Sequence, residues 1–160
     1  SKGLKALIGV LKKNGFLKLG LYSEIARKDV VKARKYIASK NLQANEVSIR
    51  DFRETIFSGK KQELNSLLDS TDFYSLSSCR DLCFHTKEHR FTIEQLQETL
   101  KSNQLNFLGF SLPQAIKSLY EYYFPEDRKQ TNLQNWATFE EKHPNTFASM
   151  YQFWVSKIEN

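Results

Sequence analysis

Residues 79–110 read CRDLCFHTKEHRFTIEQLQETLKSNQLNFLGF and place a polar loop, a capped helix and a short apolar strand in succession. Thr92 and Gln95 have the spacing of a capping box, which predicts that a helix begins there. The apolar side chains after it recur every three or four residues, and Asn103 is typical of a helix end. The run 105–110 is too short for a helix and suits a strand, so the sequence predicts a helix that covers a sheet.

The loop before this helix holds polar side chains that suit substrate binding. His85, Glu88, His89 and Arg90 lie close together in the sequence, at a position where open α/β sheets bind ligands. Each histidine could act as a general base or a polar contact, since its unperturbed pKa is near neutrality, or could bond a loop carbonyl. Arg90 could hold an anionic substrate or form a structural pair with Glu88.

Cys79, Cys83, His85 and His89 have the side chains that bind zinc. On one continuous helix, however, Cys83 and His85 would point roughly 200° apart, at ~100° per residue. The four side chains therefore cannot converge unless the helix ends between them. We expect no metal site, and two buried, reduced cysteines.

The composition is that of a folded globular protein. With 160 residues, 40% of them hydrophobic and 13% aromatic, the chain can bury a core as a single domain over 1–160. The aromatic content favours packing over an apolar substrate pocket, and Trp136 and Trp154 are expected in the core. Because no apolar run approaches the ~20 residues of a membrane span, we expect a cytoplasmic protein without a membrane partner.

The net charge of +6 comes mostly from residues 1–40, where Lys and Arg outnumber Glu24 and Asp29. A basic face that also carries Tyr22 and Tyr36 could bind phosphates and stack on bases. The charges instead fit solvated helix faces, and no nucleic-acid-binding motif is present. Binding of nucleic acid is therefore the least favoured function.

Two further strands are predicted, and a helical stretch follows the first of them. Residues 16–22, FLKLGLY, and residues 151–157, YQFWVSK, both alternate in the way strands do. Residues 25–90 have mostly helical patterns. Tyr22 and Glu24 lie at the carboxyl end of the first strand, which is the ligand edge of an α/β sheet. Side chains that can accept hydrogen bonds from early helix amides mark the expected starts of other helices: Asp29, Ser48, Ser77 or Ser78, and Asn132.

Three segments resemble one known family. Residues 7–17, LIGVLKKNGFL, are similar to the segment of class I S-adenosylmethionine-dependent methyltransferases in which a helix runs through a Leu-Leu-Lys-Pro-Gly-Gly turn into the fifth strand. Residues 91–110 are similar to the following helix and sixth strand, and 151–155 to the antiparallel seventh. The resemblance implies a helix-rich α/β fold with a partial methyltransferase-like sheet of about three strands, the last one antiparallel, and a large helical insertion.

A narrower resemblance is to bacterial proteins that join this methyltransferase domain to tetratricopeptide repeats. Its segments are Leu21–Glu24 (LYSE), 79–85 (CRDLCFH), 88–91 (EHRF) and 147–154 (FASMYQFW). The chain departs from the family at Asn14, where the turn usually has proline, and Asn also tolerates turn geometry.

A larger departure concerns the cofactor. The chain has neither the glycine-rich loop nor the acidic residue with which the family holds S-adenosylmethionine. The resemblance therefore implies the substrate-side portion of a methyltransferase that uses S-adenosylmethionine only in the complete protein and is inactive alone. A non-catalytic protein interaction module is the alternative. The methyl acceptor is left open, and the expected partner is the missing amino-terminal half or another copy of the chain.

Two geometric expectations follow from this reading. The substrate-binding candidates are Tyr22, Glu24, His85, Glu88, His89 and Arg90. Tyr22, His85 and His89 should lie on one side of the sheet, near its carboxyl edge. One flank of the strand 16–22 should lack a partner, so that the chain self-associates there unless one of its own helices covers the strand.

Overall fold

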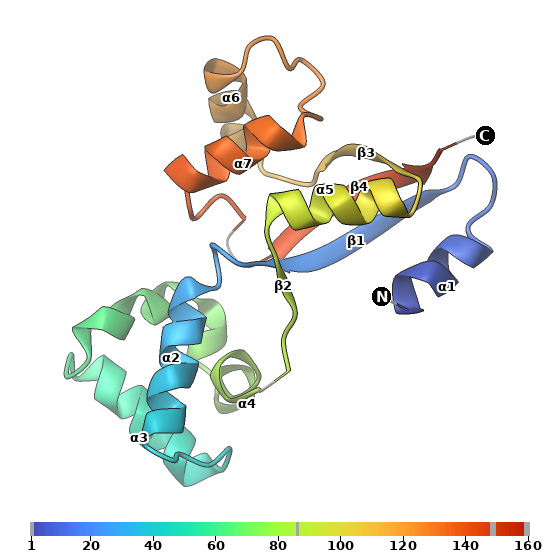
Figure 1. The fold of residues 1–160 in the computed structure, drawn as a ribbon. Helices are drawn as coiled ribbons and strands as arrows, with labels where there is room; N and C mark the ends of the chain where they lie inside the picture. The colour runs from blue at the N-terminus through green and yellow to red at the C-terminus, as the bar shows by residue number, and fades with distance from the viewer. Residues whose placement is uncertain (1, 86, 148–149, 159–160) are drawn as a thin grey trace. The chain divides into compact units, whose positions relative to one another are not determined.

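The computed structural model describes residues 2–85, 87–147 and 150–158 (Figure 1). The chain divides into two compact units, and each unit has its own hydrophobic core. The first unit comprises Ser1–Ala26 and His89–Asn160, and the second comprises Arg27–Glu88. The second unit thus occupies nearly the same residues as the helical insertion predicted over 25–90, and the single domain over 1–160 stays a prediction.

The first unit contains a mixed sheet with the strand order β2-β1-β4-β3. Its strands are β1 (Phe16–Ser23), β2 (Arg90–Phe91), β3 (Leu105–Phe110) and β4 (Met150–Lys157). Strand β2 runs parallel to β1, whereas β4 is antiparallel to both β1 and β3. The predicted α/β class is confirmed. The sheet has four strands rather than about three, because two residues of the predicted polar loop pair with the end of β1.

The helices of this unit are α1 (Lys2–Val10), α5 (Ile93–Ser102), α6 (Gln114–Tyr123) and α7 (Leu133–Lys142). Two of them, α5 and α7, begin at residues whose side chains cap them. Thr92 and Gln95 form the predicted capping box of α5, with bonds of 3.3 and 3.1 Å between each side chain and the other residue's amide. Asn132 caps α7 as predicted. The Asn14 backbone has a φ of 59°, which fits the predicted turn.

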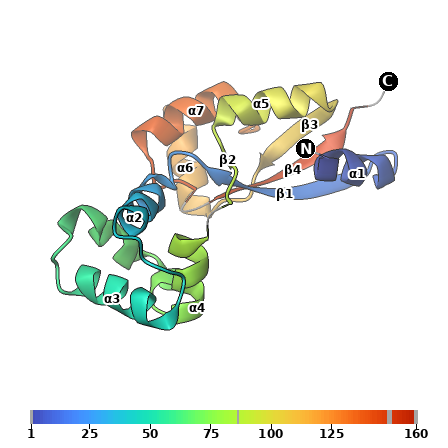
Figure 2. The same cartoon turned by 60° about the horizontal axis from the view of Figure 1, so that its bottom comes forward.

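One face of the sheet holds the core of the first unit. Tyr151, Phe153 and Val155 of β4 are completely buried there, against the apolar stripes of α5 and α7. Figures 1 and 2 both show α5 lying along the sheet. The alternate positions of β4 face the other way, and Trp154 is 43% exposed. The expectation that Trp154 lies in the core is therefore wrong, whereas Trp136, only 1% exposed, is a core residue as expected.

Strand β3 contains a β-bulge near its carboxyl end. Its pairing with β4 shifts between Phe107 and Gly109, so that Leu108 is the extra residue. Gly109 has a φ of 129°, a conformation that L side chains rarely adopt. The bulge lets Phe107 and Phe110 contact each other at a ring-centroid distance of 4.9 Å although regular alternation would put them on opposite faces.

The second unit is helical. Its elements are α2 (Lys28–Ser39), α3 (Glu46–Phe57), η1 (Gln62–Asp69), η2 (Thr71–Phe73), α4 (Leu76–Cys79) and the π-helical turn η3 (Arg80–Phe84). Three predicted helix starts are wrong by a few residues: Asn45 rather than Ser48 caps α3, Ser75 rather than Ser77 or Ser78 caps α4, and Arg27 rather than Asp29 precedes α2. For α3 and α4, a neighbouring side chain of similar capping ability explains the shift, since Asn45 and Ser75 accept from the Ser48 and Ser78 amides. Arg27 makes no side-chain cap bond, and Asp29 lies in the first turn of α2.

Candidate functional site

The carboxyl end of β1 brings together three of the residues predicted to bind a substrate. Tyr22 pairs with Arg90 in the register of β1 and β2, and the Glu24 amide donates to the Phe91 carbonyl at 2.9 Å. Arg90 Nε donates to Glu24 Oε2 at 2.9 Å. Tyr22, Glu24 and Arg90 therefore form one polar cluster at the predicted edge of the sheet.

This cluster is open to solvent. The side chains of Arg90 and Glu24 are 25% and 45% exposed, so their ion pair contributes little to stability. Arg90 uses Nε for this pair, and it makes no second hydrogen bond within the described ranges. Its terminal N–H groups are thus free to bind an anion bidentately, while Glu24 holds the guanidinium in place.

A second polar cluster begins at Ser23, directly after Tyr22. Unlike the first cluster, it is buried. Ser23 Oγ donates to Glu140 Oε1 at 2.5 Å, and the Tyr151 hydroxyl donates to Glu140 Oε2 at 2.7 Å. Ser23 Oγ also accepts from the Ala26 amide at 3.0 Å. Ser23, Glu140 and Tyr151 are at most 1% exposed. The cluster thus fixes the turn after β1 to α7 and β4.

The buried cluster was not predicted, although one signal for it exists. Glu140 lies four residues after Trp136 and seven after Leu133, so it falls on the apolar stripe of α7. A carboxylate at such a position needs partners within the protein. Burial raises the pKa of Tyr151, and the charge of Glu140 raises it further. The tyrosine therefore remains a hydrogen-bond donor at neutral pH.

Glu88 belongs to the second unit and has a structural role there. Its carboxylate accepts from Arg27 at 2.6 and 3.2 Å and from Arg34 at 3.0 Å. Its side chain is 4% exposed. Burial alone would raise the pKa of Glu88, but the hydrogen bonds and charges of Arg27 and Arg34 hold it below its usual value. The expected pairing of Glu88 with Arg90 is wrong, because each residue has a different partner.

The two candidate histidines are both exposed. His85 belongs to the second unit and His89 to the first. The expectation that both histidines lie on the same side of the sheet as Tyr22, near its carboxyl edge, stays a prediction. The described residues contain no group of three or more His, Cys, Asp or Glu that could hold a metal ion.

Cys79 and Cys83 are buried in the core of the second unit as free thiols, as predicted. They lie one turn apart at the junction of α4 and η3. The hydrogen bond with Cys79 raises the pKa of the Cys83 thiol, and burial adds to this effect. A protonated, buried thiol of this kind behaves as a small apolar side chain.

The structure does not fit a binding site for S-adenosylmethionine. The family cradles this cofactor in a glycine-rich loop after a strand. The turn after β1 runs through Glu24 and Arg27, and the segment after β3 runs from Ser111 to Pro113, and neither contains glycine. Gly20 lies within β1 rather than after it.

No protein-family model matches the chain, and no curated protein is significantly similar to it. Among the residues that the structure describes, no helix has the length and apolar character needed to cross a membrane.

Proposed function

We propose that this chain is the substrate-side portion of an S-adenosylmethionine-dependent methyltransferase and that the cofactor-binding half comes from elsewhere. The observation that carries the proposal is the position of β4, the last strand, which lies antiparallel between β1 and β3. The methyltransferase resemblance requires an antiparallel last strand in a sheet whose earlier strands are parallel to each other. The bacterial origin belongs to this proposal only through the resemblance, the cytoplasmic location remains a prediction from the sequence, and the methyl acceptor stays open.

In this proposal the Tyr22, Glu24 and Arg90 cluster faces the substrate. It lies at the carboxyl end of β1, where α/β sheets bind ligands. Arg90 would orient an anionic or polar acceptor, and Glu24 would keep the guanidinium in position. The buried Ser23, Glu140 and Tyr151 cluster keeps the strand end rigid, which a site of this kind needs.

A non-catalytic protein interaction module is the second candidate, and one observation favours it. Strand β1 pairs with β2 only at Tyr22 and Ser23, so the flank opposite β4 has no strand partner over residues 16–21 within the described ranges. Such an edge can accept an added strand from another chain. The missing half, a second copy or an unrelated protein would each use this edge.

Binding of S-adenosylmethionine distinguishes these functions. Calorimetric titration of this chain should show no saturable binding, since it lacks the cofactor loop. A longer protein that carries a glycine-rich strand-turn-helix unit upstream should bind with a Kd in the micromolar range, which corresponds to about 8 kcal/mol. Saturable binding by the chain alone would show that the assignment of the missing half is wrong. A longer protein that also fails to bind would leave the interaction module as the function.

A further inference from the structure

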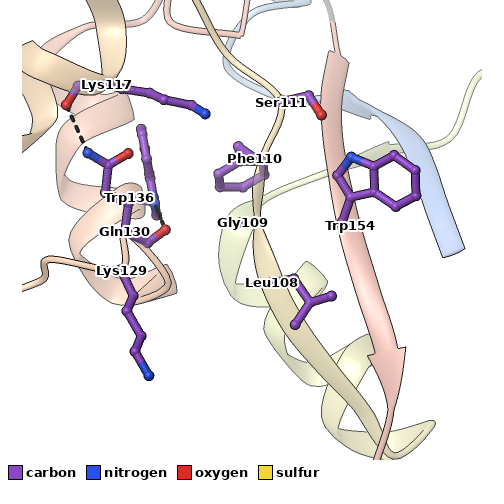
Figure 3. Close-up of a pocket in the computed structure, with 9 residues that line it drawn as sticks. All are labelled: Leu108, Gly109, Phe110, Ser111, Lys117, Lys129, Gln130, Trp136 and Trp154. Carbon is purple, nitrogen blue, oxygen red and sulfur yellow. Dashed lines mark hydrogen bonds between the residues drawn. The ribbon is translucent and has the colours of Figure 1, made fainter. Parts of the chain in front are cut away.

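A cavity in the first unit lies outside the cluster at the end of β1. It has a volume of about 260 Å³ and lies between the carboxyl end of β3 and the loop that precedes α7 (Figure 3). Phe110 and Trp136 form part of its apolar lining, and both belong to the core. Their buried rings give the cavity a rigid floor.

The charged groups that line this cavity are both cations. Lys117 of α6 and Lys129 of the following loop contribute them, and the lining contains no carboxylate. None of the ion pairs within the described ranges includes either lysine. The Lys117 side chain extends across the cavity toward Ser111 (Figure 3). The Lys129 side chain extends away from that of Lys117, so it adds its charge at the rim of the cavity (Figure 3). An unpaired ammonium group beside an apolar floor, with a second cation at the rim, favours a ligand that carries negative charge.

The polar groups of the loop are held in place. The Gln130 side-chain amide donates to the Lys117 backbone carbonyl at 3.1 Å, and the Gln130 backbone carbonyl accepts from Trp136 Nε1 at 2.9 Å (Figure 3). Gln130 also has a φ of 54°, which its loop conformation requires. The Ser111 hydroxyl, on the opposite wall, has no hydrogen-bond partner within the described ranges and is thus available to a ligand.

The β-bulge leaves free space at the centre of the cavity. A side chain added at Gly109 would meet no atom within 4 Å. Gly109 lies between Lys117 on one side and Trp154 on the other (Figure 3). The Trp154 indole is 43% exposed, so a flat ring over Gly109 could stack on it. Bulges often lie next to binding sites because they redirect neighbouring side chains.

We propose that this cavity binds the phosphate monoester of a small molecule with a flat ring, such as a nucleoside monophosphate. Lys117 would bind the phosphate, with Ser111 as a hydrogen-bond donor, and Trp154 would stack on the ring. Lys129, whose side chain extends away from Lys117, would add positive charge at the rim of the cavity (Figure 3). A phosphate monoester carries about −1.5 to −2 charges at pH 7, so the two positive charges of the cavity attract it more strongly than they attract a single carboxylate. This site is independent of the proposed methyltransferase function.

The size of the cavity limits the ligand. Sites for drug-sized molecules occupy about 300–1,000 Å³, whereas this cavity has about 260 Å³. It therefore suits one phosphate and one ring system rather than a dinucleotide. The ring would remain partly exposed beside Trp154, so we expect modest selectivity among bases.

The test is calorimetric titration of the whole chain at low ionic strength with each of the four common ribonucleoside 5′-monophosphates. At least one should bind saturably, and at least tenfold more tightly than the matching nucleoside or inorganic phosphate. Replacing both lysines, as Lys117→Gln with Lys129→Gln, should weaken binding at least tenfold. Lys101→Gln, a matched change at an exposed residue on α5, should leave the Kd within twofold.

A spectroscopic readout checks the aromatic contact. Binding should quench the tryptophan fluorescence of the natural protein, because Trp154 is exposed and Trp136 is buried. Trp154→Phe should retain binding within about threefold, since phenylalanine still stacks, but lose most of the quenching. The proposal is overturned if no monophosphate binds, if phosphate alone binds equally well, if the double lysine variant binds normally or if quenching persists without Trp154.

Discussion

Glu140 places a carboxylate among the apolar side chains of α7, where two hydroxyl groups donate to its oxygens. A buried carboxylate is costly unless it is hydrogen-bonded, so the cluster stabilises the fold only while it is complete. The hydrogen bonds of Ser23 also hold the turn after β1, which contains the substrate-binding candidate Glu24. Stability and site geometry therefore depend on the same three side chains.

We expect Tyr151→Phe to reduce the free energy of unfolding by about 1–3 kcal/mol, because it removes one donor from a buried charged acceptor. Glu140→Ala should cost more, about 3–5 kcal/mol, since it leaves two buried hydroxyls without their acceptor and creates a cavity. Urea denaturation followed by circular dichroism measures both. The exposed neighbour Glu141→Gln should change stability by no more than about 0.5 kcal/mol. A Tyr151→Phe variant as stable as the natural protein would contradict this account.

Glu88 in the second unit allows a matched comparison of ion pairs. Glu88→Gln removes the buried negative charge that pairs with Arg27 and Arg34 and should destabilise the second unit by about 3–5 kcal/mol. Glu46→Gln breaks a pair with Arg50 in which both side chains are more than 60% exposed, and should cost about 0.5 kcal/mol or less. Hydrogen exchange of residues 27–85, measured for both variants, separates these effects. Equal losses of protection would show that burial of Glu88 has no energetic role.

The pH dependence of the Glu88 effect has a defined sign. Its pKa is lower in the folded protein than the ordinary value of 4.5, so its stabilising contribution is present above that value and is lost as the pH falls through the lowered pKa. The difference in stability between the natural protein and Glu88→Gln should therefore be constant near pH 7 and shrink below about pH 4.5. A difference that grows in acid would contradict the assignment.

Among the elements of the sheet, β1 is paired with β4 from Phe16 to Tyr22 but with β2 only at its end. Residues 16–21 lack a strand partner on one flank within the described ranges, and Lys18 is the only charge in that segment. A short strand, β2, covers the end of this flank at Tyr22 and Ser23, where we expected either no cover or a helix. Phe16 beside the open edge is 65% exposed.

We therefore expect the chain to self-associate through β1, with a mass measured by light scattering that rises over a concentration series. Phe16→Glu should shift this association to at least tenfold higher concentration, because it places charge at an unpaired strand edge. Val47→Glu is the matched control: Val47 is 69% exposed and lies on α3 in the second unit. A monomer that is stable at all concentrations would show that the open flank of β1 is not an association site.

The elements that could be predicted are those whose signals are local. The capping box at Thr92 and the alternation in β4 depend on neighbouring residues, and the structure has both. Strand β2 could not be predicted, because two residues become a strand only through pairing with a segment more than sixty positions away. The partners of Glu24 and Glu88 were missed for the same reason, since sequence proximity favoured a pair between Glu88 and Arg90. The bulge at Leu108 leaves no periodic signal in so short a strand.

At the scale of the whole molecule, the two units have cores with no residue in common. The two segments of the first unit that flank residues 27–88 are also joined to each other, because the Glu24 amide donates to the Phe91 carbonyl at 2.9 Å. A short Gly-Ser linker in place of residues 27–88 should therefore leave the first unit folded. The nuclear magnetic resonance signal of the Trp136 indole N–H, which donates to Gln130, should keep its chemical shift. Loss of dispersed signals would show that the first unit depends on the second.

The two outer edges of the sheet differ, and this difference limits how large any assembly can become. The β-bulge at Leu108 and Gly109 interrupts β3, and an interrupted, strongly twisted strand is a poor template for another strand. Growth by strand addition is thus confined to β1. When two copies join through β1 by a twofold axis, each uses the one receptive sheet edge found among the described residues, so strand addition stops at a dimer. A sheet with one receptive edge can dimerise, but it cannot extend into a fibre.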